Sequence, residues 1–117
     1  MLGIGCQERA EREIAELRKT VSPLLPGPIA ASVQEGDGCD SGDGGYLLFS
    51  ADIATDSNRI VGPFMSRGWR KIDPAHDEVG GKFINGVTLV QSGKDIDLII
   101  SRADDDTKID IYVTYGS

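Results

Sequence analysis

The sequence predicts an α+β fold, with two helices packed on one face of a mostly antiparallel sheet that ends in a C-terminal β-meander. Two observations support this prediction. Near the N-terminus, apolar residues recur at steps of three and four, as in an amphipathic helix. In the last third of the chain they alternate with polar residues, as in strands. The chain, residues 1–117, has the length of one domain with an ordinary core.

The first helix is expected over residues 7–21. Acidic residues lead and basic residues trail on its polar face, which suits the helix dipole. Pro23, Pro26 and Pro28 follow and should end the helix. The apolar positions that stack on one face, and therefore predict packing against a sheet, are Cys6, Ala10, Ile14, Leu17, Val21 and Leu24.

Two strands and a second helix should follow. Residues 29–34 are a candidate strand, and residues 46–53 form a strand that is apolar on both faces at its start and so should lie inside the sheet. Residues 57–68 have helical periodicity. Ser57 is the candidate N-cap, and Gly68 can close the helix in a left-handed conformation.

The proline in Gly62-Pro63 should kink this second helix or delay its start to Pro63, because proline removes a backbone hydrogen bond. A short strand over residues 69–72 comes next. Its Trp69 is interpreted as a core anchor, since a lone tryptophan at a helix-to-strand corner more often packs in the core than binds a ligand.

The rest of the chain is predicted to be a meander. Asn85-Gly86 is a strong signal for a two-residue hairpin turn between strands at 82–84 and 87–90. Residues 95–100 and 109–115 then alternate between apolar and polar side chains. One face of this sheet should therefore be apolar and covered by helices, and the other acidic and polar.

Charge excludes some classes of function. The net charge is −7, and phosphate backbones and anionic membrane surfaces repel such a protein unless a basic patch is concentrated locally. The basic residues are scattered, so nucleic acid is not an expected partner. No apolar run approaches the length of a membrane span, so none is expected.

Residues 1–6 have two readings. They resemble the end of an export signal just before a lipidated cysteine, Cys6, although a complete signal peptide is not recognised. They also fit a flexible start that leads into the first helix. The sequence does not decide between these two interpretations. The first of them implies a lipid anchor at Cys6.

The two cysteines, Cys6 and Cys39, bear on the compartment. In an exported protein they would most simply pair with each other. The alternatives are a lipidated Cys6 that leaves Cys39 unpaired, or two free thiols in the cytoplasm. Two cysteines and one distant histidine, His76, do not suit a zinc site.

The glycine- and aspartate-rich stretch at residues 35–46 fits none of the common ion or phosphate loops. Read as a calcium loop from Asp37, it has Leu48 where the twelfth position needs an acidic ligand. Read as a phosphate loop, it lacks the Gly-Lys-Ser/Thr ending. His76 lies in a polar loop without a recognisable catalytic partner motif. We therefore expect no cofactor, no metal and no catalytic residues.

A group of acidic residues on the last strands and in the turn between them could form a surface for calcium or for a cationic partner. The competing interpretation is a charged hairpin tip that resists edge-to-edge aggregation. The candidate residues are Asp95, Asp97, Asp104, Asp105, Asp106 and Asp110.

Four features follow one another along the chain: Cys6, Pro26-Gly27, the turn Cys39-Asp40-Ser41-Gly42-Asp43-Gly44, and Gly68-Trp69. In these features the chain resembles a group of small, uncharacterised secreted or lipoprotein-like proteins of high-GC actinobacteria. The resemblance spans most of the chain. It implies a location in the cell envelope and a Cys6–Cys39 bridge, and it implies no enzymatic activity.

These observations favour a non-catalytic, extracytoplasmic binding domain of a bacterial cell envelope, with a cytoplasmic location as the alternative. A second hypothesis is a small acidic inhibitor or immunity-type protein that blocks a basic partner enzyme, because a strongly negative protein is steered towards a basic target. An enzyme that uses His76 is the third and weakest hypothesis.

The disulfide is directly testable. Protein exported to an oxidising compartment should show no thiol that can be alkylated before reduction, and two after reduction, measured by intact mass. Two alkylatable thiols in the unreduced exported protein would contradict the Cys6–Cys39 bridge.

Overall fold

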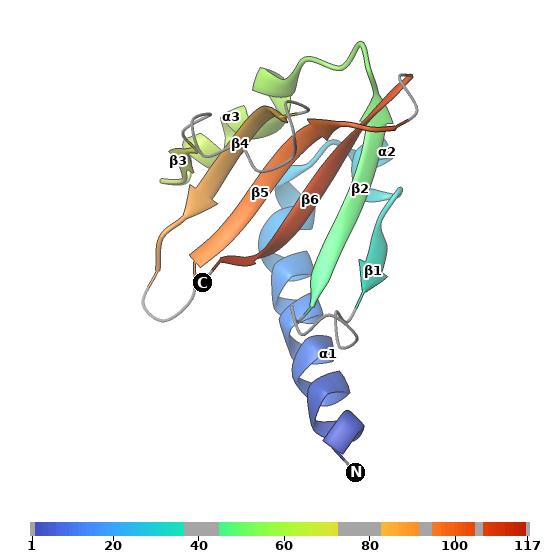
Figure 1. The fold of residues 1–117 in the computed structure, drawn as a ribbon. Coiled ribbons are helices and arrows are strands. Elements are labelled where there is room, and N and C mark those ends of the chain that lie inside the picture. The colour runs from blue at the N-terminus through green and yellow to red at the C-terminus, as the bar shows by residue number, and fades with distance from the viewer. Residues whose placement is uncertain (1, 37–44, 73–82, 92–94, 105–106, 117) are drawn as a thin grey trace.

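A computed structural model describes residues 2–36, 45–72, 83–91, 95–104 and 107–116 (Figure 1). It confirms the α+β class, the antiparallel sheet and the C-terminal meander. The helical elements are α1 (Leu2–Val21), the 3-10 turn η1 (Ser22–Leu24), α2 (Gly27–Ala30) and α3 (Ser57–Met65). The strands are β1 (Gln34–Gly36), β2 (Tyr46–Asp52), β3 (Arg70–Lys71), β4 (Phe83–Leu89), β5 (Asp95–Arg102) and β6 (Lys108–Gly116).

The six strands form one sheet in the order β1-β2-β6-β5-β4-β3, and every neighbouring pair is antiparallel. β4, β5 and β6 are consecutive in sequence and adjacent in space. β2 lies inside the sheet, as its apolar start predicts, between β1 and β6. Both edge strands are short, with three residues in β1 and two in β3, which limits pairing with other chains.

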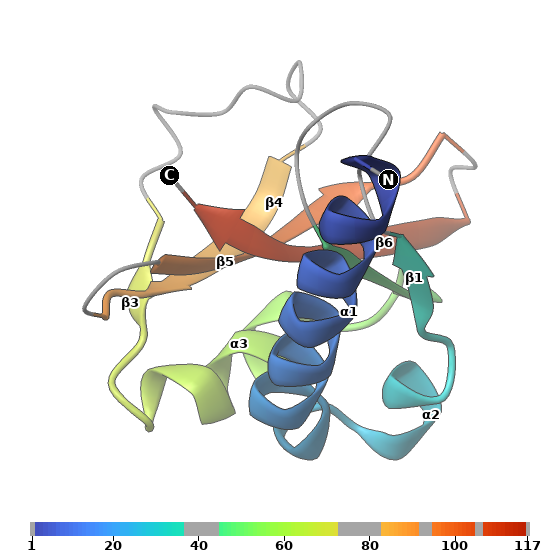
Figure 2. The same cartoon turned by 90° about the horizontal axis from the view of Figure 1, so that it is seen from below.

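The helices lie on one side of the sheet, with α1 running beneath the central strands and α3 beneath the β4 side (Figure 2). Between helices and sheet is one apolar core. α1 contributes Leu17 and Val21, and α3 contributes Ile60, Val61 and Phe64. The sheet contributes alternate residues of its long strands: Leu47, Phe49, Val87, Ile96, Leu98, Ile100, Ile109, Ile111 and Val113.

Trp69 is a core anchor, as predicted. It is 5% exposed and belongs to the core cluster. Its ring meets that of Phe64 edge-on, with ring centroids 5.0 Å apart, a geometry that aromatic pairs favour. This contact fixes the corner between α3 and β3.

The start of the first helix and the N-cap of the helix at Ser57–Met65 differ from the predictions. α1 begins at Leu2, earlier than the predicted residue 7. The N-cap of α3 is Asp56 rather than Ser57, because the Asp56 carboxylate accepts a hydrogen bond of 2.9 Å from the Asn58 backbone N–H. Ser57 is the first residue of the helix.

α3 runs through Pro63, so the helix is not delayed to that residue. The backbone hydrogen bond that proline removes is offset by burial of Ile60, Val61 and Phe64 on one side of this helix. After the helix, Gly68 has a φ of 95°, the left-handed conformation that the sequence predicts.

The strand predicted at residues 29–34 is wrong. Gly27–Ala30 form the short helix α2, which has proline within its first two positions, and only Gln34 enters a strand. Ser32 then ties this segment to β2. Its hydroxyl donates to the Ile29 carbonyl at 2.6 Å and accepts from the Ser50 N–H at 3.0 Å.

The hairpin turn predicted at Asn85-Gly86 is also wrong, since both residues lie inside β4 and are buried. A β-bulge separates Phe83, which pairs with Ser101, from Asn85, which pairs with Ile100. The extra residue changes the face on which each side chain lies, because paired residues share a face. Asn85 therefore points inward with Ile100, where its amide is bonded, and the turn propensity is overridden.

Polar groups and close packing attach α1 to the sheet. The Glu13 carboxylate accepts a hydrogen bond of 3.1 Å from the Gly45 N–H, at the start of β2. Gly45 is buried so closely beneath α1 that a β-carbon there would lie 2.8 Å from the Ala10 carbonyl oxygen. The Tyr115 side chain of β6 lies near the carboxylates of Glu16 and Glu13. Burial, and next the nearby carboxylates of Glu16 and Glu13, raise the pKa of Tyr115 above its ordinary value.

Gly45→Ala should destabilise the protein by about 1–3 kcal/mol, because the added methyl group must displace the backbone of α1. Urea denaturation followed by circular dichroism measures the effect. Ala31→Ser, at an exposed position just beyond α2, is the control and should leave the stability within about 0.5 kcal/mol of wild type. Equal stability of Gly45→Ala and wild type would contradict the close α1–β2 contact.

Tyr115 should make the protein sensitive to alkali. In the unfolded chain its phenol loses a proton near pH 10, whereas the folded protein holds that proton to higher pH. The stability it contributes is therefore complete below pH 10 and is lost as the pH rises from there. Tyr115→Phe should flatten this loss, measured as Tm from pH 8 to pH 11. An equally steep loss of Tm in the variant would contradict the assignment.

Candidate functional site: the open face of the sheet

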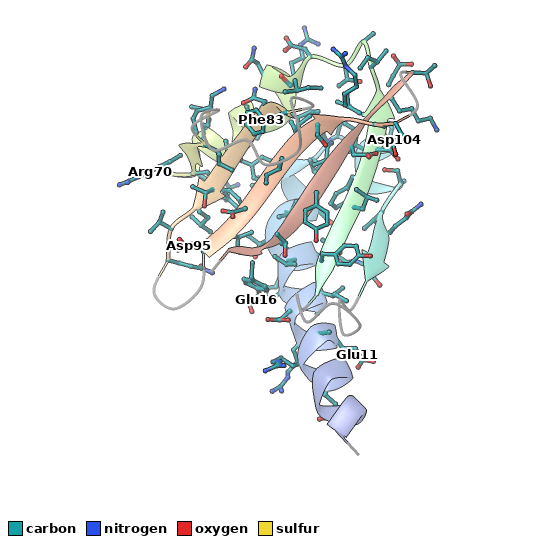
Figure 3. The ribbon with its side chains drawn as sticks, viewed as in Figure 1. Glu11, Glu16, Arg70, Phe83, Asp95 and Asp104 are labelled. Atoms are coloured by element: carbon teal, nitrogen blue, oxygen red, sulfur yellow. The ribbon has the colours of Figure 1, made fainter. Side chains whose placement is uncertain are left out.

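The sheet has one face that none of the described helices covers, and we call it the open face (Figures 1 and 2). Strand alternation sends the core residues inward and the residues between them to this face. From β2 it receives Tyr46, Leu48 and Ser50, and from β6 it receives Asp110, Tyr112 and Thr114. Figure 3 looks onto this face and labels Phe83 and Asp95, which begin the neighbouring antiparallel strands β4 and β5 and so lie at opposite ends of that strand pair.

Across the middle of the open face runs a row of apolar side chains. The register aligns Leu48 of β2, Tyr112 of β6 and Ile99 of β5 side by side, followed by Gly86 of β4. Tyr46 and Phe83 extend the row at its two ends. We call these five side chains, all of them half-buried, the apolar row: Tyr46, Leu48, Phe83, Ile99 and Tyr112.

Two glycines make room for the rings at the ends of the row. A β-carbon at Gly36 of the edge strand would overlap the ring of Tyr46, so this ring lies over the glycine. Tyr46 also contacts Tyr112, with ring centroids 5.3 Å apart and planes 34° apart. At the other end, the ring of Phe83 lies 3.2 Å from the place where a β-carbon of Gly86 would be. The row is thus continuous from β1 to β4.

The predicted acidic surface is divided by this row. Asp97 pairs with Thr114 on one side of the row, and Asp110 pairs with Ser101 on the other. Four residues along β6 separate the two positions, a distance of about 13 Å. The Asp97 carboxylate also accepts a hydrogen bond of 2.7 Å from the Thr88 hydroxyl, which fixes its orientation. The carboxylates therefore flank an apolar centre.

The remaining candidate acids lie at the ends. Asp95 begins β5, two residues before Asp97 and on the same face. Asp104 is exposed after the end of β5, at the turn towards β6. Asp105 and Asp106 lie outside the described residues. The structure therefore brings Asp95, Asp97 and Asp110 onto one face, with Asp104 beyond its end.

The apolar row was not predicted from the sequence, since the face opposite the helices was expected to be acidic and polar. The signal was present in the alternation itself. Ile99 shares its face with Asp95 and Asp97, and Tyr112 shares its face with Asp110. Phe83 could not be placed from the sequence, because the bulge in β4 decides its face.

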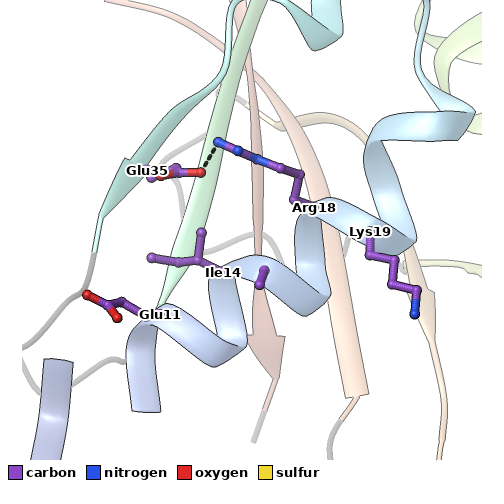
Figure 4. Close-up of a pocket in the computed structure, with 6 residues that line it drawn as sticks. Glu11, Ile14, Arg18, Lys19 and Glu35 are labelled. Carbon is purple, nitrogen blue, oxygen red and sulfur yellow. Dashed lines mark hydrogen bonds and ion pairs between the residues drawn. The ribbon is translucent and has the colours of Figure 1, made fainter. Parts of the chain in front are cut away.

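A shallow groove of about 410 Å³ lies elsewhere, between α1 and β1 (Figure 4). Its lining residues are Glu11, Ile14, Ala15, Arg18, Lys19 and Glu35. Arg18 and Glu35 form an ion pair across it, and their side chains are 50% and 38% exposed. An ion pair in water at this exposure adds little stability. The groove brings together no set of groups that suits catalysis.

Other predicted residues are not placed by the structure. Cys6 lies within α1, but its side chain is not among those described, and Cys39 and His76 fall outside the described residues. The pairing of the cysteines and the role of the histidine stay predictions. In the described part of the chain, no three His, Cys, Asp or Glu side chains gather as metal ligands would. None of the described helices has the length and apolarity of a membrane span.

No known protein family matches the chain, and no match was found among curated proteins or solved structures. Function is therefore inferred from the open face itself.

Proposed function

We propose that this protein is a non-catalytic binding domain of a bacterial cell envelope, and that it holds a partner protein on the open face. The single observation that carries the proposal is the apolar row, with two tyrosines, a phenylalanine and two aliphatic residues on one face of four adjacent strands. Tyrosine and phenylalanine are enriched at interfaces, because they bury a large area at a small cost in side-chain entropy.

The arrangement of the face supports this proposal. Protein interfaces have an apolar centre that excludes water and a polar rim around it. Here the apolar row is the centre, and Thr88, Asp97 and Thr114 on one side and Ser101 and Asp110 on the other form the rim. Each apolar side chain is only half-buried in the isolated chain, so a partner can remove further apolar area from water.

The charges favour a basic partner. The register and alternation of the described strands place more carboxylates than cations on this face. The four carboxylates are those of Asp52, Asp95, Asp97 and Asp110, and the two cations are Arg70 and Lys108. The whole chain adds to this field with a net charge of −7. Lysine or arginine side chains of a partner would meet carboxylates on both sides of the row, and cation–π contact with Tyr112 lies between them.

The same carboxylates favour a second candidate, an acidic inhibitor or immunity-type protein whose partner is a basic enzyme. The two candidates share the binding face and differ in what the partner does. Loss of the partner's activity on binding distinguishes the inhibitor from a purely structural binding domain.

The envelope location rests on the cysteines and on the resemblance to secreted actinobacterial proteins. Cell fractionation tests it separately. Recovery of the untagged protein in the envelope or medium supports the location, whereas recovery with cytoplasmic enzymes contradicts it and leaves the binding proposal intact.

The binding face is tested in two steps. A photo-crosslinking residue replaces Ile99 on the open face or, in the control, exposed Ala31 beyond α2. The partner should be captured from position 99 and not from position 31. The captured partner is then purified for affinity measurements.

With the purified partner, Ile99→Ala and Tyr112→Ala should each weaken binding about tenfold, as residues at the centre of an interface do. Asp97→Asn with Asp110→Asn should weaken binding several-fold and reduce its dependence on salt. Glu8→Gln with Glu11→Gln removes the same charge from the exposed side of α1 and should leave binding within about twofold. Equal effects of the two charge pairs would show that net charge alone attracts the partner, and would contradict the proposal.

A further inference from the structure

Asn85 is a buried polar residue whose side chain lies on the core side of β4, on the opposite face from the apolar row. It is 6% exposed and lies in β4, directly before Gly86. Asparagine followed by glycine is the dipeptide most prone to deamidation in flexible chains, because glycine leaves the next backbone nitrogen free to approach the side-chain carbon. The Asn85-Gly86 dipeptide, which predicted a turn, therefore also has the sequence that favours deamidation.

The amide of Asn85 has partners at both ends. Its oxygen accepts hydrogen bonds from the Lys71 ammonium at 2.6 Å and from the Gly86 N–H at 2.9 Å. Its nitrogen donates to the Ser57 hydroxyl at 3.2 Å and to the Asn58 side-chain oxygen at 3.3 Å. This network joins β3, β4 and the first turn of α3. We call it the Asn85 network: Ser57, Asn58, Lys71, Asn85 and Gly86.

We propose that Asn85 is a latent deamidation site, closed in the folded protein by the Asn85 network and exposed when the β3 and α3 end of the domain opens. In the reaction, the Gly86 backbone nitrogen gives up its proton and bonds to the side-chain carbon of Asn85. The bond from that carbon to the amide nitrogen breaks, and ammonia leaves with the proton. Water then opens the cyclic imide to aspartate or isoaspartate, so the net change is amide plus water to acid plus ammonia.

The folded geometry opposes the first step for three reasons. The Gly86 N–H points at the Asn85 oxygen, so the nitrogen's electron pair is not directed at the carbon it must attack. The Gly86 carbonyl accepts from the Ile72 N–H at 3.0 Å, which holds the peptide in the sheet. Burial also keeps out the water or hydroxide that would take the proton.

To open this end of the domain, only a short stretch of strand pairing has to break, that between β3 and β4. β3 has two residues and pairs with β4 alone. Short edge elements open locally more often than the centre of a sheet. Because deamidation is irreversible, the modified fraction would record how often this end has opened.

Deamidation should in turn weaken the closed state. A carboxylate at position 85 has no N–H to donate, so the Asn58 oxygen would face another acceptor. The Lys71 ammonium and the Gly86 N–H would gain from the new negative charge, but a carboxylate at this buried position also loses its hydration. Asn85→Asp, which reproduces one product, should therefore lower the Tm by several degrees.

The test compares folded protein with protein unfolded in urea, at the same mildly alkaline pH, by peptide mass mapping over time. Asn58, followed by Arg59, is the internal control, since it is the other asparagine of the sequence. In urea, Asn85 should deamidate faster than Asn58. In the folded protein, its rate should fall at least about tenfold, because it must wait for opening.

The variant Ser57→Ala tests whether the Asn85 network slows deamidation in the folded protein, since it removes an acceptor of the Asn85 amide. It should raise the folded rate at Asn85 several-fold and leave the rate in urea unchanged. Folded and unfolded rates within about twofold of each other would overturn the proposal, as would a folded rate that Ser57→Ala leaves unchanged. Neither result bears on partner binding by the open face.

Discussion

Most of this fold depends on one constraint, the antiparallel register of β2, β6 and β5. Paired residues share a face, so the pairing of Leu47 with Val113, and of Val113 with Leu98, commits these side chains to the core beneath the sheet. α1 and α3 cover that face. The same register sends Leu48, Tyr112 and Ile99 to the other face. A slip of one residue would bury the aspartates and expose the core.

The open face follows from this arrangement. Among the described residues, the helices lie on one side of the sheet (Figure 2), and the apolar residues on the other side are covered only in part, by their neighbours on the strands. Tyr46 packs on Gly36 and Tyr112, and Phe83 packs beside Gly86, which shields each ring in part. The flanking carboxylates keep the surface hydrated and limit self-association, because a second copy would bring the same charge. A basic partner would relieve that repulsion.

Much of the fold could be predicted from the sequence, because long periodic segments determine their own structure. The spacing of Ala10, Leu17 and Val21 identifies α1, and the alternation in β5 and β6 identifies the meander. Asn85-Gly86 could not be placed, since contacts with Lys71 and Ser57, distant in sequence, override its turn propensity. Part of the open face could be predicted, since alternation along β5 and β6 places its aspartates. The position of Phe83 could not, because it depends on the bulge in β4.

The most direct test of the central claim, that the open face binds the partner, is NMR mapping with the purified partner. Backbone amide signals of Leu48, Ile99 and Tyr112, together with those of Asp97 and Asp110, should shift or broaden as the partner is added. Signals from the exposed side of α1 should not change. Perturbation centred on α1 and the groove at Arg18 and Glu35, with the open face unaffected, would contradict the account.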